Sequence, residues 1–162
     1  MGKTTFFAEP GRQVAVITCS FDAPRATVFK TFTNPDLIPL WWGPRILKTT
    51  VDRMDVRPGG IWRYNQFDPD GNEYAFHGVY HDVAPPERLV QTFEFEGMPG
   101  HVLLETVTFE ERNGGTMLTD ISVFQTVEDR DGMIASGMKE GGIETMDRLA
   151  ELLAPPRKGE TP

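Results

Sequence analysis

The sequence has little cysteine and no long hydrophobic run. Cys19 is the only cysteine among its 162 residues, so no internal disulfide can form, which fits a reducing compartment. No apolar run approaches the roughly 20 residues that a bilayer-spanning helix needs. The first residues, MGKTTFFAEPGR, hold no apolar stretch long enough for a secretory signal. We therefore expect a cytoplasmic protein without a membrane span.

Blocks of basic residues are also missing. Lys and Arg number 16 against 24 Asp and Glu, so the net charge is −8, and the positive residues stand singly along the chain. A field of this sign repels a phosphate backbone unless a local basic patch overcomes it. We expect no nucleic-acid partner.

Motifs for phosphate binding, covalent catalysis and metal binding are absent too. GMKEGG (137–142) lacks the preceding strand and the following Lys-Ser/Thr of a phosphate loop, and no Gly-x-Ser-x-Gly elbow occurs. His77 and His81 share one face of a predicted strand, but four residues at about 3.3 Å each place them roughly 13 Å apart. Two imidazoles at that separation cannot bind one zinc ion, whose ligands lie at about 2 Å. We expect neither a metal nor another cofactor.

What the chain does contain is a regular series of turn signals, such as RPGG (57–60), DPDGN (68–72) and RNGG (112–115). The length suits one domain. Runs of strand length between the turns predict seven strands, at about 13–21, 46–56, 61–67, 73–83, 88–95, 102–111 and 116–125. Because tight turns join most of them, consecutive strands should be antiparallel neighbours.

Helical spacing appears in two places. Apolar residues within DAPRATVFKTFTNPD (22–36) predict a helix that Asn34-Pro35 stops, and a second, very short helix should end near Trp41 because Pro39 lies about one turn in. The segment 127–154 has an apolar stripe and predicts one long final helix, which contains the glycines Gly137, Gly141 and Gly142. Each glycine costs such a helix about 1 kcal/mol, so either the helix bends or a missing side chain makes room for a ligand.

These parts predict an α+β fold in which a curved, seven-stranded antiparallel sheet wraps the long C-terminal helix and two short helices follow the first strand. Residues 12–154 would form this single domain, with flexible tails at 1–11 and 155–162.

The order of several segments resembles a known family, the START-like (helix-grip, Bet v 1-like) superfamily, and within it the branch of Hsp90-ATPase-activator homologues. The matching segments are FDAPRATVFKTFTNP (21–35), WWGP (41–44), RPGGIWRY (57–64), DPDGNEY (68–74), HGVYHDVAPPERLVQTFEF (77–95) and GGTMLTDI (114–121). The resemblance implies a cavity between sheet and last helix that binds apolar small molecules. Its members include lipid carriers and polyketide cyclases, and the eukaryotic namesake stimulates a chaperone ATPase. Where the family usually has Gly-Trp in the last helix, this chain has Gly141-Gly142, and the lost indole implies a void or a roomier cavity.

The adjacent tryptophans Trp41 and Trp42 stand where a helix gives way to a loop. They either fill the core or form the cavity wall, since an indole offers a large apolar area with a polar N–H. We expect at least one of them to contact the cavity. The residues predicted to bind the ligand are Trp41, Trp42, Trp62, Tyr64, Phe93, Met138, Gly142 and Met146.

Three titratable residues are weak candidates for catalysis. Asp120 belongs to one alternating set of its strand (Leu118, Asp120, Ser122, Phe124), but the other set, with Ile121 and Val123, is more continuously apolar and is favoured to face inward. Glu105 lies near the start of its strand, where exposure to solvent is favoured. His77 could face the cavity as a general acid or base.

The leading hypothesis is therefore a binding domain for a hydrophobic small molecule. A cyclase- or hydrolase-type enzyme that uses the same cavity, and a module that interacts with a chaperone or a regulator, remain alternatives, and a homodimer stays open.

Overall fold

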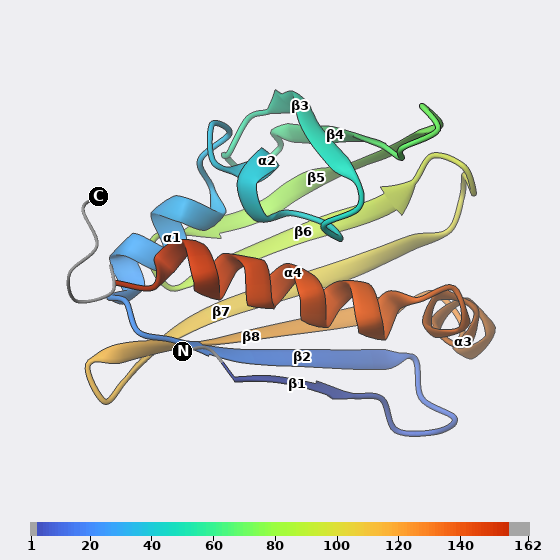
Figure 1. The fold of residues 1–162 in the computed structure, drawn as a ribbon. Helices are drawn as coiled ribbons and strands as arrows, with labels where there is room; N and C mark the ends of the chain where they lie inside the picture. Colours follow the sequence, from blue (N-terminus) through green and yellow to red (C-terminus); the bar gives the residue numbers. More distant parts are fainter. Residues whose placement is uncertain (1–2, 156–162) are drawn as a thin grey trace.

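The computed structural model of the chain describes residues 3–155, which form an eight-stranded antiparallel sheet and four helices (Figure 1). The strand order across the sheet is β1-β2-β8-β7-β6-β5-β4-β3, so β3 to β8 form a meander and β1 and β2 extend its other edge. The strands are β1 (Thr4–Phe7), β2 (Val14–Phe21), β3 (Lys48–Met54), β4 (Ile61–Phe67), β5 (Glu73–Ala84), β6 (Arg88–Phe95), β7 (Val102–Arg112) and β8 (Gly115–Phe124).

The prediction of seven strands was wrong by one. The additional strand, β1, lies inside the segment expected to be an N-terminal tail and pairs with β2, with Phe6 opposite Ile17. Tertiary contacts hold this segment in place. Thr4 donates a hydrogen bond from Oγ1 to Asp147 Oδ1 at 3.1 Å, and the buried Arg130 donates from Nη1 to the carbonyl of Glu9 at 2.6 Å. The predicted C-terminal tail, apart from Pro155, lies outside the described residues.

Two short helices follow β2, as predicted. They are α1 (Arg25–Phe32) and α2 (Ile38–Trp41), which ends at Trp41 where the proline spacing placed its end.

The prediction of one long final helix was wrong. The segment forms two helices, α3 (Val127–Ala135) and α4 (Met138–Leu153), joined at Gly137. Gly137 has φ 104°, a conformation that side-chain-bearing L-residues rarely adopt and that an α-helix cannot contain. The chain therefore turns at this glycine, and α4 starts in a new direction.

Helix α4 crosses the inner face of the curved sheet, and α3 lies at its N-terminal end (Figure 1). The core fills the space between α4 and the sheet, where Leu149 of α4, Val107 of β7 and Leu118 of β8 have no exposed surface. The inner face of β2 presents Ala15, Ile17, Cys19 and Phe21, the phase expected from the sequence. Helices α1 and α2 close one end of this layer.

Candidate functional site

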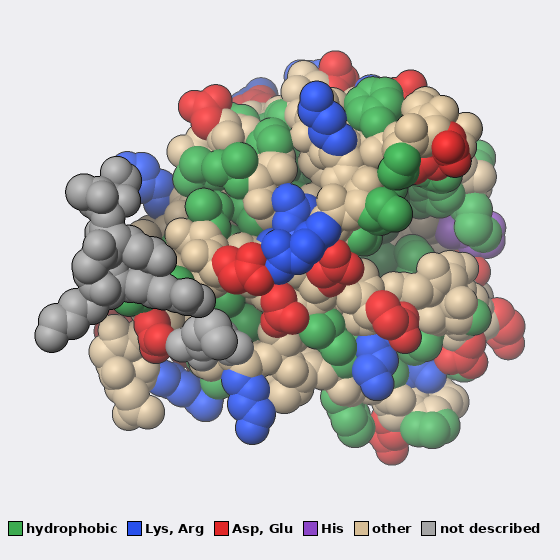
Figure 2. Space-filling view, viewed as in Figure 1, with side chains coloured by type: hydrophobic (Ala, Val, Ile, Leu, Met, Phe, Trp, Pro, Cys, Tyr) green, Lys and Arg blue, Asp and Glu red, His purple; other side chains and the backbone are tan. Residues whose placement is uncertain are grey.

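A cavity of about 340 Å³ lies between α4 and the inner face of the sheet. The molecule is hollowed beside the first turns of α4, with hydrophobic side chains in the depth (Figure 2). Residues of every strand from β2 to β8 except β3, together with all four helices, line the space. Its volume lies at the lower end of the roughly 300–1,000 Å³ typical of small-molecule pockets.

All eight residues that the sequence predicted as a ligand site line this cavity: Trp41, Trp42, Trp62, Tyr64, Phe93, Met138, Gly142 and Met146. The two adjacent tryptophans nevertheless differ in role. Trp41 is 1% exposed, packs on Phe32 with ring centroids 5.0 Å apart and belongs to the core, whereas Trp42 is only partly buried. Trp41 therefore fills the core and also lines the cavity, and Trp42 forms part of the cavity wall.

Trp42 is the centre of an aromatic cluster that forms one wall of the cavity. Its ring lies edge-on to Tyr64, with centroids 4.9 Å apart, and to Phe76 at 5.4 Å. Trp62 and Phe93 complete the cluster at 6.3 and 6.5 Å from Trp42. These separations suit the edge-to-face geometry that aromatic quadrupoles prefer, so the wall is both apolar and well ordered.

The opposite side of the cavity contains two carboxyl groups, and here both expectations from the sequence were wrong. Leu118, Asp120, Ser122 and Phe124 form the inward set of β8, while Ile121 and Val123 are 37% and 40% exposed on the outer face. Glu105 lies in the inward set of β7 and lines the cavity instead of facing solvent. The outer face keeps its apolar side chains exposed, so alternation alone could not show which set is buried.

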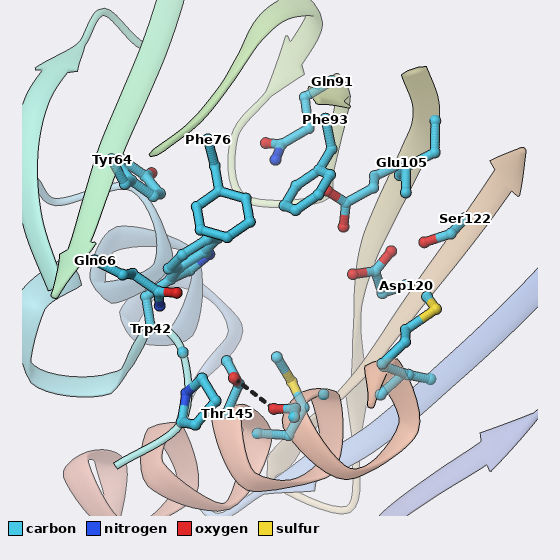
Figure 3. Close-up of a pocket in the computed structure, with 18 of the residues that line it drawn as sticks. Trp42, Tyr64, Gln66, Phe76, Gln91, Phe93, Glu105, Asp120, Ser122 and Thr145 are labelled. Carbon is cyan, nitrogen blue, oxygen red and sulfur yellow. Dashed lines mark hydrogen bonds between the residues drawn. The ribbon is translucent and has the colours of Figure 1, made fainter. Parts of the chain in front are cut away.

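Strand register brings the two carboxyls together. Glu105 is directly opposite Ser122, and Asp120 is opposite Val107, so Glu105 and Asp120 are diagonal neighbours on adjacent strands. Their carboxyl groups lie next to each other in Figure 3. Gln91 is directly opposite Glu105 on β6 and lines the same part of the cavity. We call Glu105 and Asp120 the acid pair.

Burial changes the titration of the acid pair. Loss of hydration raises the pKa of Asp120 well above its usual range, and repulsion from Glu105 raises it further. The pKa of Glu105 is also raised by desolvation, against a smaller lowering effect of the neighbouring polar groups of Asp120 and Gln91. Two neighbouring desolvated carboxyls resist double ionisation, so the pair retains a proton at higher pH than exposed carboxyls do.

His77, the third catalytic candidate, lies elsewhere. It belongs to the outer face of β5, where Nδ1 is 2.9 Å from Glu96 Oε2, and it does not line the cavity. Glu96 is also bound by Arg63, whose Nε donates at 2.8 Å. This ion-pair network is separated from the cavity by the sheet. Within residues 3–155, no three His, Cys, Asp or Glu side chains form a group suited to hold a metal ion.

The helical glycines serve different purposes. Gly137 separates the two helices, and a Cβ on Gly142 would lie 2.6 Å from Cδ1 of Ile17, so the missing side chain lets α4 approach β2 closely. A Cβ on Gly141 would lie at an ordinary 3.8 Å from Pro44 Cγ.

The loop that follows Trp42 is fastened to both neighbouring elements. Arg148 of α4 donates from Nη1 to the carbonyl of Gly43 at 2.7 Å and from Nη2 to that of Leu40 at 3.0 Å. Thr49 of β3 donates from Oγ1 to the carbonyl of Trp42 at 2.9 Å. These bonds hold the Trp42 indole against the cavity.

Sequence reasoning missed several polar residues that line the cavity, namely Gln66, Gln91, Ser122 and Thr145. The signal was present for Gln66 and Gln91, because Gln66 shares the strand face of Trp62 and Tyr64, and Gln91 shares that of Phe93. Figure 3 shows these glutamines on the same cavity as the aromatic residues.

The comparisons with known proteins agree with this architecture. Residues 22–154 match the family described as "Activator of Hsp90 ATPase homolog 1-like protein". The chain belongs to this family. No curated protein matches the sequence.

Solved structures of bacterial relatives share the fold over nearly the whole chain. Protein Ms6760 from Mycobacterium smegmatis is 25% identical, with a TM-score of 0.86 over 96% of this chain and 99% of its own. A protein from Arthrobacter aurescens, solved in solution by NMR, is 25% identical, with a TM-score of 0.87 over 94% of this chain and 92% of its own. A protein from Rhodobacter sphaeroides, solved as a crystal structure, is also 25% identical, with a TM-score of 0.84 over 93% of this chain and 98% of its own. None of the helices within residues 3–155 has the length and apolarity required to cross a membrane.

Proposed function

We propose that this member of the Activator of Hsp90 ATPase homolog 1-like family binds an apolar small molecule, of lipid-, polyketide- or aromatic-like character, in the cavity between α4 and the sheet. The supporting observation is the aromatic wall around Trp42, which faces about 340 Å³ of space beside buried core residues. Proteins of this fold commonly bind hydrophobic ligands.

The energetic reason is the burial of apolar surface. Moving apolar area from water into such a wall stabilises a complex by about 25 cal/mol per Å². Two methionines of α4, Met138 and Met146, also line the cavity, and flexible thioethers adapt to ligands of different shape. The wall thus suits a ligand with an aromatic or polycyclic body.

The proposal can be tested with N-phenyl-1-naphthylamine, an uncharged fluorescent probe. We expect saturable binding of one probe per chain, and native mass spectrometry of the purified protein should show whether a cellular molecule occupies the same space. Gly142→Trp, which restores the indole usual in the family, should lower the affinity by roughly tenfold or more, because the new side chain must displace Ile17, which also lines the cavity, and occupy part of the same space.

Gly132→Ala is the matched control, because a Cβ at Gly132 of α3 has no heavy atom within 4 Å. Its affinity should equal that of the parent chain. Binding that is unchanged in a folded Gly142→Trp variant would place the probe outside the cavity and refute the proposal.

A second function, acid–base catalysis on a cavity ligand, is favoured by the acid pair, because two neighbouring carboxyls with raised pKa values hold a proton at higher pH than exposed carboxyls and can pass it to a ligand. An enolisable benzylic ketone such as 2-tetralone tests it through solvent deuterium exchange followed by NMR. Catalysed exchange should disappear in Asp120→Asn and Glu105→Gln but persist in Glu110→Gln, whose carboxyl is exposed on the outer face of β7. Exchange that survives both cavity substitutions would exclude this role.

A further inference from the structure

The acid pair has more hydrogen-bond acceptors than the protein satisfies. Oδ1 of Asp120 is buried, and no N–H or hydroxyl group of the described residues donates to it. Gln91 is the polar neighbour of Glu105 on β6, and its side-chain amide offers at most two N–H donors to the pair. Since two carboxyl groups offer about eight acceptor positions, the pair is complementary to a group that brings several donors.

Positive charge is missing from the same place. The cavity lining contains no Arg, Lys or His within the part of the chain that the structure describes. Apart from the acid pair, its titratable groups are Tyr64 of β4 and Tyr80 of β5, and burial raises the pKa of both phenols, which therefore stay neutral. The helices contribute only apolar, hydroxyl-bearing or glycine residues. Burying a carboxylate without a cationic partner costs free energy. A ligand that supplies a positive charge removes this cost and therefore binds more tightly.

The aromatic wall extends along the cavity as far as the acid pair. Figure 3 shows the ring of Phe93 close to Glu105, with Trp42, Tyr64 and Phe76 farther along the same space. Aromatic faces attract cations as well as apolar groups. A ligand that reaches from the wall to the acid pair thus meets apolar surface first and carboxyl oxygens at its end.

We propose that the acid pair, Glu105 and Asp120, binds the protonated amino group of an apolar amine whose aromatic or aliphatic body fills the cavity. An ammonium group brings a full positive charge and three hydrogen-bond donors, so it supplies both the donors and the positive charge that the cavity lacks around the acid pair. A hydroxyl group brings a single donor and no charge. A carboxylate brings further acceptors and a repelling charge, so fatty acids are disfavoured. This inference rests on the proposed cavity-binding function and specifies its ligand class.

The proposal predicts a dependence on pH. Because the amine favours the ionised form of the pair, its affinity should rise as the pH increases from about 5 to about 8, while the amine itself remains protonated. A neutral ligand of the same shape should show no such rise. Binding should also release protons, which calorimetry in two buffers of different ionisation enthalpy detects.

The test uses three naphthalene probes that differ only in the terminal group: 2-(2-naphthyl)ethylamine, 2-(2-naphthyl)ethanol and 3-(2-naphthyl)propanoate. Titration calorimetry on the full chain should show that the amine binds roughly tenfold or more tightly than the alcohol, and that the carboxylate binds least. Asp120→Asn and Glu105→Gln each preserve side-chain shape. Each should lower the amine affinity by roughly tenfold and leave the alcohol affinity nearly unchanged.

Glu110→Gln is the control on the same strand and should leave all three affinities unchanged. Circular dichroism verifies folding, and either cavity variant suffices if the other fails to fold. Equal binding of amine and alcohol, or an amine affinity unaffected by the folded variants, would overturn the amine assignment while the cavity-binding function stands. If none of the probes, including the uncharged one used above, binds the parent chain, the cavity-binding function fails and the amine assignment with it.

Discussion

Replacing Asp120 by asparagine tests the acid pair through the stability of the fold, independently of any ligand. In the folded chain desolvation raises the pKa of Asp120 well above its usual range, whereas in the unfolded chain the carboxyl returns to about 3.9. Between these two values the native state binds one more proton than the unfolded state. The free energy of unfolding must therefore fall as the pH rises through this window.

The dependence of stability on pH follows from proton linkage. Where the folded chain binds one proton more than the unfolded chain, the free energy of unfolding falls by about 1.4 kcal/mol per pH unit, up to the pH at which the folded pair ionises. Asp120→Asn removes this titration and the repulsion on Glu105. Relative to the parent chain the variant should therefore gain stability as the pH rises from about 5.5, by up to about 1.4 kcal/mol for each unit within the window.

Urea unfolding followed by tryptophan fluorescence at several pH values between about 5.5 and 8 measures this difference. Carboxyls with a lowered pKa, such as Glu96 beside Arg63, act in the opposite sense, but their contribution is lost only as the pH falls below about 4.5. Glu110→Gln should follow the parent chain at every pH. A stability difference between parent and Asp120→Asn that does not change with pH would refute the reasoning.

Three further predictions concern α4 and the loop beside it. Gly141→Ala should raise the free energy of unfolding by about 0.5–1 kcal/mol, because alanine favours a helix and the new Cβ makes only an ordinary contact. Gly137→Ala should lower the free energy of unfolding by at least about 1 kcal/mol, because Gly137 has a positive φ. Thermal melts compare the two variants. Arg148→Met should lower stability by about 2 kcal/mol and speed amide hydrogen exchange in residues 40–47, since the hydrogen bonds to the carbonyls of Leu40 and Gly43 are lost. Unchanged exchange would show that these bonds do not hold the segment. Trp42→Leu should weaken binding of N-phenyl-1-naphthylamine by roughly tenfold in fluorescence titrations, and an unchanged affinity would contradict the role of the aromatic wall.

Turn chemistry made most of the fold predictable. Segments such as DPDGN and RNGG fix where strands end because Gly and Asn adopt positive φ there, and each of the seven predicted strands overlaps an observed one. Helix α2 ends at Trp41 as expected, although Pro39 lies in its first turn, where proline is tolerated, and so does not itself end the helix.

Two features of the fold could not be predicted from local pattern. The four residues of β1 show no alternation of their own, and pairing with β2 is what makes them a strand. Gly137 was recognised as unfavourable in a helix, but sequence reasoning could not distinguish a bend, a ligand space and a full break. The positive φ of Gly137, directly after the C-cap residue Ser136 of α3, shows that the helix breaks there.

The aromatic wall and the acid pair show where sequence information ends. The sequence by itself determined that Trp62, Tyr64 and Phe93 face one side of their strands and that Trp42 follows a helix end, because side-chain alternation and proline geometry act within a few residues. Tertiary structure decided which side of β8 is buried, since both of its alternating sets contain apolar residues and α4 covers only one of them. It also decided that Glu105 and Asp120 meet, because their proximity depends on the register between two strands and on the water that the packed helix excludes.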